Sequence, residues 1–411
     1  MKFSRKIAPD TKPKQNFIIK KRLREDEINF DKLRSYRLDR VKKELEKNNL
    51  EACILFDPVN VRYALDSLNM SVYNMHNLTR YCFIPVTGPT ILYEYFNCEN
   101  LSSHLNLIDE IRPAITWDYF SNGDQASKEL KKWINEIKDL SNKYFKSKKV
   151  AVDVLNGPAV SALNKEGIEV VDAKLILEQA RVIKSPDELI CMKAAIEVAE
   201  MGVSKMRSEL KAGMTEDELW SILHKTNIEN GGEWIDCRIL SSGQRTNPWM
   251  QESSNKVIQH GELVAFDTDM VGPYGYCADI SRAFVVGNKF SDEQKKLYHM
   301  AQEQINHNSR LIKDGVSFQE FTEKSWELPE EYYPNRYSVM VHGIGMCDEW
   351  PAIRYPTDGG ERSGIFSKNM TITVESYIGK VGGREGVKLE QQYLIGENGL
   401  ELMSHHPLED I

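Results

Sequence analysis

The stretch 265–282 constrains the fold of this chain more than any other, because it places three aspartates around a turn. The apolar run Leu263–Phe266 predicts a buried strand, and this strand ends in two carboxylates, Asp267 and Asp269. Two glycines and a proline follow and predict a tight turn. A second strand then carries Asp279 back beside the first two aspartates.

Three carboxylates at such short range repel one another unless a cation lies between them. The hairpin therefore indicates a metal site. Aspartates are also common turn-forming residues, so the hairpin alone leaves both interpretations open.

Three residues further along the chain favour the metal interpretation. His342 lies in the segment 341–345, where glycines leave its imidazole accessible. Glu375 ends a predicted strand that begins at Met370, and Glu390 lies within a strand with apolar neighbours. Each of them alone is compatible with a core histidine or a salt-bridge partner. Together with the aspartates they form an oxygen-rich set with one nitrogen, which suits one or two hard or borderline divalent ions.

Length and composition restrict the class of protein. A chain of 411 residues predicts two domains. The net charge of −8 and an isoelectric point near 5.7 argue against a nucleic-acid partner, which needs a basic face. Seven cysteines without a CxxC motif indicate neither a disulfide framework nor a thiolate zinc site. The sequence shows no signal-peptide core and no apolar run of about 18 residues, and so predicts a cytoplasmic protein without a membrane partner.

The order of predicted elements divides the chain into three parts and gives an α+β fold class. Residues 1–30 are polar and predict an N-terminal arm. Residues 31–178 alternate between predicted helices and strands, which is typical of a smaller α/β domain. Residues 179–411 begin with a helix capped at Ser185 and contain the whole acidic set, so they predict the catalytic domain.

The C-terminal part resembles the pita-bread metallopeptidases, which include methionine aminopeptidases, Xaa-Pro peptidases and creatinase. The phrases Gly275–Arg282 and His342–Gly345 are close to motifs of this family. The resemblance assigns the metal ligands to Asp267, Asp269, Asp279, His342, Glu375 and Glu390, with the order of importance of Asp267 and Asp269 left open. The upstream half resembles the N-terminal domain of creatinase, so the resemblance implies a creatinase-like two-domain protein with a pita-bread C-terminal metal-binding domain.

Two departures separate this chain from the peptidases of that family. Asp267 lies twelve residues before Asp279 and Asp269 lies ten before it, and neither spacing is the one typical of the peptidases. The peptidases also use two histidines that are not ligands to bind substrate and move protons. At the corresponding places this chain has Trp249 and the segment Cys347–Trp350. A peptidase without both histidines lacks a proton relay worth about 10²- to 10⁴-fold in rate.

The residues found instead favour a different substrate. Trp249, Trp350 and Tyr337 would bring aromatic faces to the metal pocket, and Asp348 adds a carboxylate. Aromatic faces with a nearby acid suit a small onium cation, because each face attracts a cation by about 0.5–2 kcal/mol. The alternative is that Trp249 and Trp350 only pack in the core.

This combination is similar to one branch of the fold, the DddP-type dimethylsulfoniopropionate (DMSP) lyases. The branch has the same spacing of its three aspartates, a tyrosine at the position of Tyr337 and a proposed catalytic aspartate at the position of Asp348. The resemblance implies a homodimer that uses iron or another divalent transition metal (manganese, cobalt, nickel or zinc) and releases dimethyl sulfide and acrylate. It also implies a β-elimination in which Asp348 is the general base, Tyr337 positions the substrate, and metal ions stabilise the charge on the substrate carboxylate.

Two other functions stay open on the sequence alone. A divergent Xaa-Pro dipeptidase would hydrolyse prolyl dipeptides, although the missing histidines argue against it. A non-catalytic pita-bread binding module would usually have lost metal ligands, which this chain retains. For the homodimer, the segment Met70–Arg80, rich in Met, Tyr, Asn and His, is expected to line the pocket of the partner subunit.

Overall fold

The computed structural model describes residues 20–287, 289–360 and 362–411. They form two compact units, which we call the N-terminal unit (Asn29–Arg181) and the C-terminal unit (Lys20–Ile28 with Val182–Ile411). The division thus falls after Arg181, whereas the sequence predicts a domain boundary after residue 178. Most of the predicted arm, residues 1–19, lies outside the described residues.

The N-terminal unit is built on a six-stranded sheet with the strand order β4-β3-β2-β1-β5-β6. β1 pairs with β2 in antiparallel and with β5 in parallel orientation, so the sheet is mixed. Its strands are β1 (Ala52–Leu55), β2 (Tyr81–Pro85), β3 (Ile91–Glu94), β4 (Glu110–Pro113), β5 (Lys149–Val152) and β6 (Glu169–Asp172). Its helices are α1 (Phe30–Lys47), α2 (Pro58–Leu65), α3 (Ser71–His76), α4 (Tyr119–Asn122), α5 (Ala126–Tyr144), α6 (Gly157–Lys165) and α7 (Lys174–Arg181).

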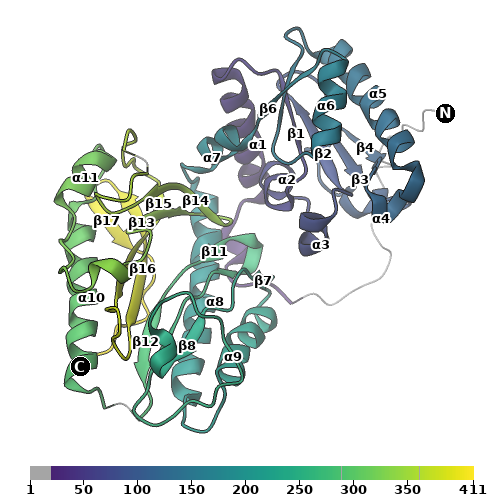
Figure 1. The fold of residues 1–411 in the computed structure, drawn as a ribbon. Coiled ribbons are helices and arrows are strands. Elements are labelled where there is room, and N and C mark those ends of the chain that lie inside the picture. Colours follow the sequence, from purple (N-terminus) through teal and green to yellow (C-terminus); the bar gives the residue numbers. More distant parts are fainter. Residues whose placement is uncertain (1–19, 288, 361) are drawn as a thin grey trace. The chain divides into compact units, whose positions relative to one another are not determined.

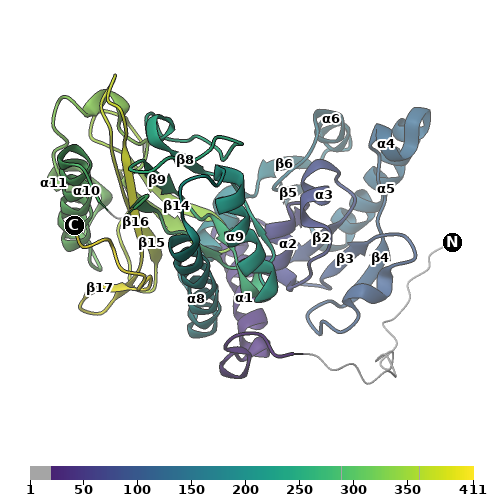
Figure 2. The same ribbon diagram turned by 90° about the horizontal axis from the view of Figure 1, so that it is seen from below.

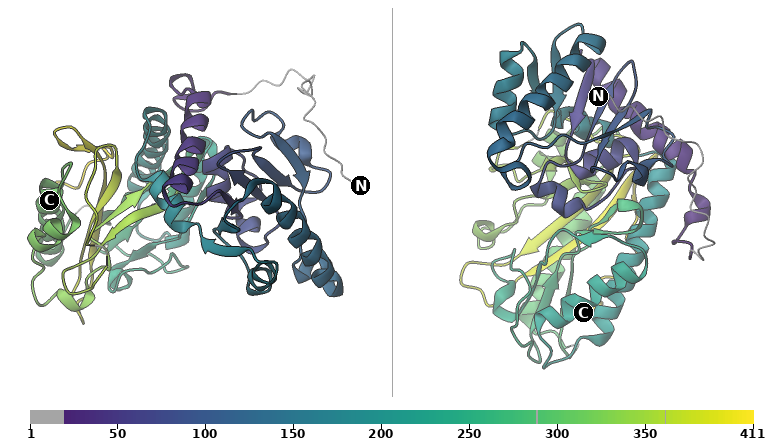
Figure 3. Two further views of the ribbon diagram at one scale, coloured as in Figure 1. Left: turned by 90° about the horizontal axis from the view of Figure 1, so that it is seen from above. Right: turned by 90° about the vertical axis from the view of Figure 1, so that its right-hand side faces the viewer.

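Helices cover both faces of this sheet, as the alternating pattern of the sequence predicts. Trp133 and Ile137 of α5 and Leu163 of α6 pack in one core cluster with Ile54 and Phe83 of the strands. Figure 3 shows α1 and the pair α5 and α6 on opposite sides of the strands. Because both faces are buried, the strands read as apolar runs with little alternation.

The C-terminal unit contains a five-stranded antiparallel sheet with the order β14-β13-β15-β16-β17 and two three-stranded sheets, β12-β9-β8 and β11-β10-β7. Its strands are β7 (Trp234–Ile235), β8 (Leu240–Ser242), β9 (Leu263–Phe266), β10 (Met270–Val271), β11 (Cys277–Ala278), β12 (Arg282–Val285), β13 (Val341–Ile344), β14 (Asp348–Ile353), β15 (Thr371–Ile378), β16 (Val387–Gly396) and β17 (Gly399–Leu402). Its helices are α8 (Pro186–Glu209), α9 (Glu216–Glu229), α10 (Asp292–Leu311) and α11 (Phe318–Lys324).

Capping boxes start the three long helices of this unit. The side chains of Ser185, Thr215 and Ser291 each accept a hydrogen bond from the backbone N–H three residues later. The side chain of that later residue in turn accepts a hydrogen bond from the backbone N–H of the capping residue. α10 and α8 lie on opposite sides of the strands (Figures 1 and 2). The strands are therefore enclosed between helices.

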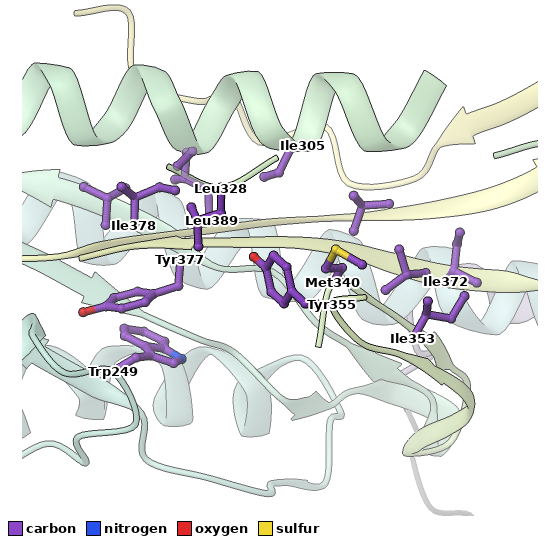
Figure 4. Packing of buried hydrophobic residues seen from close by; sticks show 14 of the residues in the cluster. Trp249, Ile305, Leu328, Met340, Ile353, Tyr355, Ile372, Tyr377, Ile378 and Leu389 are labelled. Carbon is purple, nitrogen blue, oxygen red and sulfur yellow. The ribbon is translucent and has the colours of Figure 1, made fainter. Parts of the chain in front are cut away.

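One face of the five-stranded sheet forms the main hydrophobic core. Figure 4 shows Ile305 of α10 with Ile378 and Leu389 on the helix side of the sheet, and Trp249 and Tyr377 on the other side. Because side chains alternate along a strand, this arrangement commits Ile378 and Leu389 to the core and turns their neighbours Tyr377, Lys388 and Glu390 to the opposite face.

Within the described ranges, no helix combines the length and the apolarity needed to cross a membrane. All seven cysteines are free thiols.

Candidate metal centre

The predicted hairpin forms, and it brings the three aspartates together. Met270 pairs with Ala278 across β10 and β11, and Phe266 pairs with Arg282 across β9 and β12. Asp267 and Asp269 follow β9, and Asp279 lies between β11 and β12 rather than on a strand. Ligand oxygens of all three aspartates lie within 4.8 Å of one another.

The backbone at Asp269 shows why this position carries a small polar residue. Its φ angle is +34°, in a region that side chains with a Cβ seldom adopt and that aspartate tolerates better than most residues. In this chain the position supplies a third carboxylate at the cost of a strained backbone.

The register of the five-stranded sheet brings the remaining residues of the set onto one face. Glu375 of β15 lies directly opposite Glu390 of β16. His342 of β13 lies opposite Thr373, which shares a face with Glu375 because side chains alternate along β15. Glu375 is therefore inside β15, which continues to Ile378, and does not end it as the sequence pattern predicts.

The imidazole of His342 joins the aspartates to the glutamates. Its Nε2 lies 3.1 Å from Oε1 of Glu375, 3.5 Å from Oδ2 of Asp279 and 3.6 Å from Oε1 of Glu390. Three overlapping groups could each hold an ion: Asp267 with Asp269 and Asp279, Asp279 with His342 and Glu390, and Asp267 with Glu375 and Glu390. The ammonium group of Lys388 lies against all three members of the last group, so we call the first two the ligand groups. Asp279 belongs to both of them.

Several features of this set fit a divalent metal. Oδ1 of Asp279, Oε1 of Glu375 and Oε1 of Glu390 are buried and accept no hydrogen bond from any described residue. Such orphaned oxygens are costly unless a cation binds them. Nδ1 of His342 donates a hydrogen bond to the carbonyl of Gly343 at 2.9 Å, which orients the ring so that Nε2 faces the carboxylates.

A cation of the protein itself lies within the cluster. The ammonium group of Lys388 is fully buried and donates hydrogen bonds to Oδ2 of Asp267 at 2.9 Å and Oε2 of Glu390 at 3.1 Å. It also lies 2.7 Å from Oε2 of Glu375. Sequence reasoning missed this residue, although one signal was available: Lys388 precedes Glu390 by two positions on a buried strand and so must share its face.

The electrostatics of the cluster show an excess of negative charge. Burial and mutual repulsion raise the pKa values of Asp267, Asp269 and Asp279 above the usual range. Burial lowers the pKa of Lys388, but the carboxylates more than compensate and raise it well above 10.5. Lys388 is therefore charged, and one ammonium group is too little to balance five carboxylates.

Asp348 lies at the edge of this cluster and not within it. It is the first residue of β14 and pairs with Ile344, which places Oδ1 3.8 Å from Nδ1 of His342. Its side chain is 65% exposed, in contrast to the buried ligands. Loss of surrounding water and repulsion by the nearby glutamates raise the pKa of Asp348 to about 6, while His342 opposes the rise. Asp348 is thus an accessible acid beside a buried acidic cluster.

The three predicted aromatic residues occupy different environments. The rings of Tyr337 and Trp249 face the ammonium group of Lys388, at 5.0 and 5.6 Å from Nζ to the ring centroid. Trp249 is 7% exposed and also packs near Tyr377. Trp350 is half-buried and contacts the core, with its ring 5.2 Å from that of Phe318. Tyr337 is half-buried, and its proximity to Glu375 together with burial raises the pKa of its hydroxyl far above 10.

Three further residues of the site were not predicted. Ser281 donates a hydrogen bond to Oε2 of Glu390, and the side-chain oxygen of Gln392 accepts the backbone N–H of Asp279. The thiol of Cys237 contacts the carboxylate of Asp269. These contacts join residues far apart in the sequence, and only the strand register reveals them.

Comparisons with known proteins agree with this geometry. The model of metallopeptidase family M24 matches residues 190–397. The chain is 35% identical over 390 residues to dimethylsulfoniopropionate lyase DddP of Roseovarius nubinhibens, covering 92% of this chain and 87% of that protein. It is also 35% identical to the DddP lyase of Roseobacter denitrificans, again over 92% of this chain and over 86% of that protein. A Xaa-Pro dipeptidase of Pyrococcus furiosus is 28% identical over 56% of the chain and 65% of its own length.

Solved structures confirm the predicted fold class. A Xaa-Pro dipeptidase from Bacillus anthracis aligns with a TM-score of 0.73 at 22% identity, covering 91% of this chain and 98% of that one. The prolidase from Pyrococcus horikoshii aligns with a TM-score of 0.72 at 20% identity, covering 91% and 99%. The protein therefore has the two-domain pita-bread fold. It belongs to metallopeptidase family M24, and within that family it groups with the DddP-type DMSP lyases.

Proposed function

We propose that this protein is a metal-dependent carbon–sulfur lyase that cleaves DMSP to dimethyl sulfide and acrylate. The observation that carries the proposal is the position of Asp348, an exposed carboxylate 3.8 Å from the imidazole of a buried acidic cluster. An accessible acid at this place can act as a base towards a bound substrate. The similarity to two DddP lyases over nearly the whole chain supports the same assignment.

The residues that would hold metal are Asp267, Asp269, Asp279, His342, Glu375 and Glu390. The donor set is rich in oxygen with one nitrogen, which favours iron, manganese or cobalt for function, although nickel and zinc also bind such sets. Divalent metal at this site would supply Lewis acidity towards the substrate carboxylate and so acidify the adjacent carbon. We propose iron as the native metal.

The chain's own residues complete the elimination. Asp348 takes the proton from the carbon next to the substrate carboxylate, and the electrons of that C–H bond form the new carbon–carbon double bond. The carbon–sulfur bond breaks, and dimethyl sulfide leaves with its electron pair. Asp348 lies outside the ligand groups, so its carboxylate stays free to accept a proton when metal is bound. No water is activated, so the elimination does not need the two histidines of the peptidases.

Tyr337 is the proposed positioning residue for the substrate. Its half-buried ring lies next to the cluster, and its hydroxyl stays protonated because the pKa is raised. It can therefore donate a hydrogen bond to the substrate. We also propose that Tyr337, Trp249 and Trp350 form the surroundings of the onium group, with Tyr337 the most direct of the three because the other two also pack in the core.

The test is to supply the metal-loaded protein with DMSP and to measure dimethyl sulfide in the headspace and acrylate in solution. We expect equal amounts of both products. A parallel incubation with a Xaa-Pro dipeptide tests the rival function, the dipeptidase. Hydrolysis of the dipeptide without release of dimethyl sulfide would overturn the lyase assignment, and inactivity on both after full metal loading would favour a binding module.

We further propose a cytoplasmic homodimer, with the segment Met70–Arg80 at the partner's pocket. The segment contains α3, and Met70, Val72 and Met75 are largely exposed, as contact residues would be in a separated subunit. Multi-angle light scattering should give twice the mass of the chain. A fully active monomer would contradict this assembly.

A further inference from the structure

The ammonium group of Lys388 contacts three carboxylates of the acidic cluster. Its ammonium group lies 2.9 Å from Asp267, 2.7 Å from Glu375 and 3.1 Å from Glu390, each time at the oxygen Oδ2 or Oε2. It also donates a hydrogen bond to the hydroxyl of Ser281 at 2.8 Å, and Ser281 in turn donates to Glu390. A side chain held by this many short contacts has little freedom to leave.

The two carboxylate oxygens of Glu375, and likewise those of Glu390, contact different groups. Oε2 of Glu375 and Oε2 of Glu390 lie against Lys388, whereas Oε1 of each is buried and accepts no hydrogen bond from the described residues. Both Oε1 atoms point to Nε2 of His342, at 3.1 and 3.6 Å. The ammonium group thus fixes the rotation of both carboxylates so that one oxygen of each faces the imidazole.

The charges of the cluster point to the same role. Asp267, Asp269, Asp279, Glu375 and Glu390 carry five negative charges when all are ionised. Two divalent ions, one for each of the two groups without Lys388, would supply four positive charges, and Lys388, which lies against the third group, would supply the fifth. Without a fifth charge, a buried carboxylate would stay uncompensated or take up a proton.

We propose that Lys388 is a positioning residue of the metal centre. It holds Oδ2 of Asp267 and Oε2 of Glu375 and Glu390, and thereby allows the site to bind two divalent ions. This role rests on the metal centre proposed above but not on the identity of the substrate. The rings of Trp249 and Tyr337 lie against the same ammonium group and shield it from water. These two residues therefore support the metal centre as well as shaping the substrate pocket.

The test is a calorimetric titration of the chelator-treated protein with Mn²⁺, with elemental analysis of the loaded protein. The wild type should bind two ions per chain. Lys388→Met, which keeps the length of the side chain but removes the charge and the donors, should bind the second ion at least about tenfold more weakly, as for loss of other residues that orient metal ligands. Lys388→Arg, which keeps a charged donor, should bind both ions.

Lys184→Met is the matched control, because Lys184 is also a buried lysine of the C-terminal unit but pairs with Glu349 at 2.7 Å. It should bind two ions with the affinity of the wild type. Circular dichroism verifies that each variant is folded, and if Lys388→Met is not, the neutral Lys388→Gln replaces it with the same expectation.

Two results with the Lys388 variants would overturn the proposal. One is unchanged binding by the neutral Lys388 variants. The other is tighter binding, which the loss of a positive charge alone would produce because the nearby charge repels the metal. A wild type that binds fewer than two ions would also contradict it. Because the titration contains no substrate, a failure of the lyase assay leaves this result unaffected, so the two proposals fail separately.

Discussion

The two units of the protein treat buried charge differently. In the N-terminal unit, the guanidinium of Arg80 lies 2.8 Å from the carboxylate of Glu94, and both are buried. The half-buried carboxylate of Asp66 lies 2.8 Å from the guanidinium groups of both Arg37 and Arg34. In the C-terminal unit, the five carboxylates of the cluster share one ammonium group, that of Lys388.

The difference separates a structural use of charge from a functional one. In a buried ion pair, the attraction between the two charges roughly offsets the free energy needed to remove them from water. A fold can therefore keep such a pair for specificity at little net cost. A surplus of buried carboxylates has no such balance and destabilises the unit in the absence of metal. The C-terminal unit also contains a balanced pair, Lys184 with Glu349. Four predictions test whether the paired charges serve the fold and the surplus carboxylates serve metal binding.

The largest effect is expected from Asp279→Asn. Asp279 belongs to both ligand groups and is 2% exposed, so its loss should weaken the binding of both ions and reduce turnover of DMSP to the assay blank. Elemental analysis and headspace dimethyl sulfide measure the two effects on one sample. Full metal content in this variant would show that the surplus charge serves another purpose.

The next largest effect is expected from Asp348→Asn, which removes basicity but keeps shape. Turnover should fall by about 10²- to 10⁴-fold, the usual contribution of a positioned general base. Metal content should stay at the level of the wild type, because Asp348 lies outside the two ligand groups. The exposed Asp39→Asn on α1 is a control that should change neither quantity. If Asp348→Asn releases dimethyl sulfide at a near-native rate, the base lies elsewhere, with Asp269 as the next residue to test.

A third prediction concerns the paired charges of the N-terminal unit. Arg80→Met leaves Glu94 buried without its partner and should destabilise this unit by about 3–5 kcal/mol. Hydrogen exchange of β2 and β3 measures the loss locally. The double variant Arg80→Met with Glu94→Leu should recover most of the stability, because it removes both charges. Loss of bound metal in the single variant would contradict the separation of the two kinds of charge.

The smallest effect is expected from Asp153, a buried acid of the N-terminal unit that accepts N–H groups of Phe56, Asp57 and Asn60. Burial raises the pKa of Asp153 from 3.8 to about 6. Because the folded state holds this proton more tightly than the unfolded state, the contribution of Asp153 to stability is fully present below about pH 4 and is lost as the pH rises through 6. The loss is about 3 kcal/mol.

Hydrogen exchange of β1 between pH 4 and 7 measures this loss, after correction for the intrinsic pH dependence of exchange. Asp153→Asn should remove it. A pH-independent stability of β1 in the wild type would show that the N–H donors fully offset the cost of burying the charge.

The local parts of the structure were predictable from the sequence. The capping box at Ser185 begins α8, and the turn between Asp269 and Asp279 forms the hairpin, because both depend on residues within a few positions of one another.

The residues around the metal centre depend on strand register and were less predictable. The pairing of β15 with β16 brings Lys388 to Glu375, and no local pattern contains that pairing. Asp348 and His342 are likewise brought together by the pairing of two antiparallel strands, β13 and β14. The environment of Trp350 was not predictable from local sequence either. Trp350 lies on β14, whereas its core contact, Phe318, lies on the helix α11.

The central claim is that the surplus of buried carboxylates is a site for two divalent ions. A crystal structure of the iron- or manganese-loaded protein, with anomalous diffraction at the absorption edge of the metal, tests it most directly. We predict two anomalous peaks, one bound by Asp267, Asp269 and Asp279, and one bound by Asp279, His342, Glu375 and Glu390. The absence of any peak within this cluster in fully loaded crystals, or peaks bound only by other residues, would contradict the account.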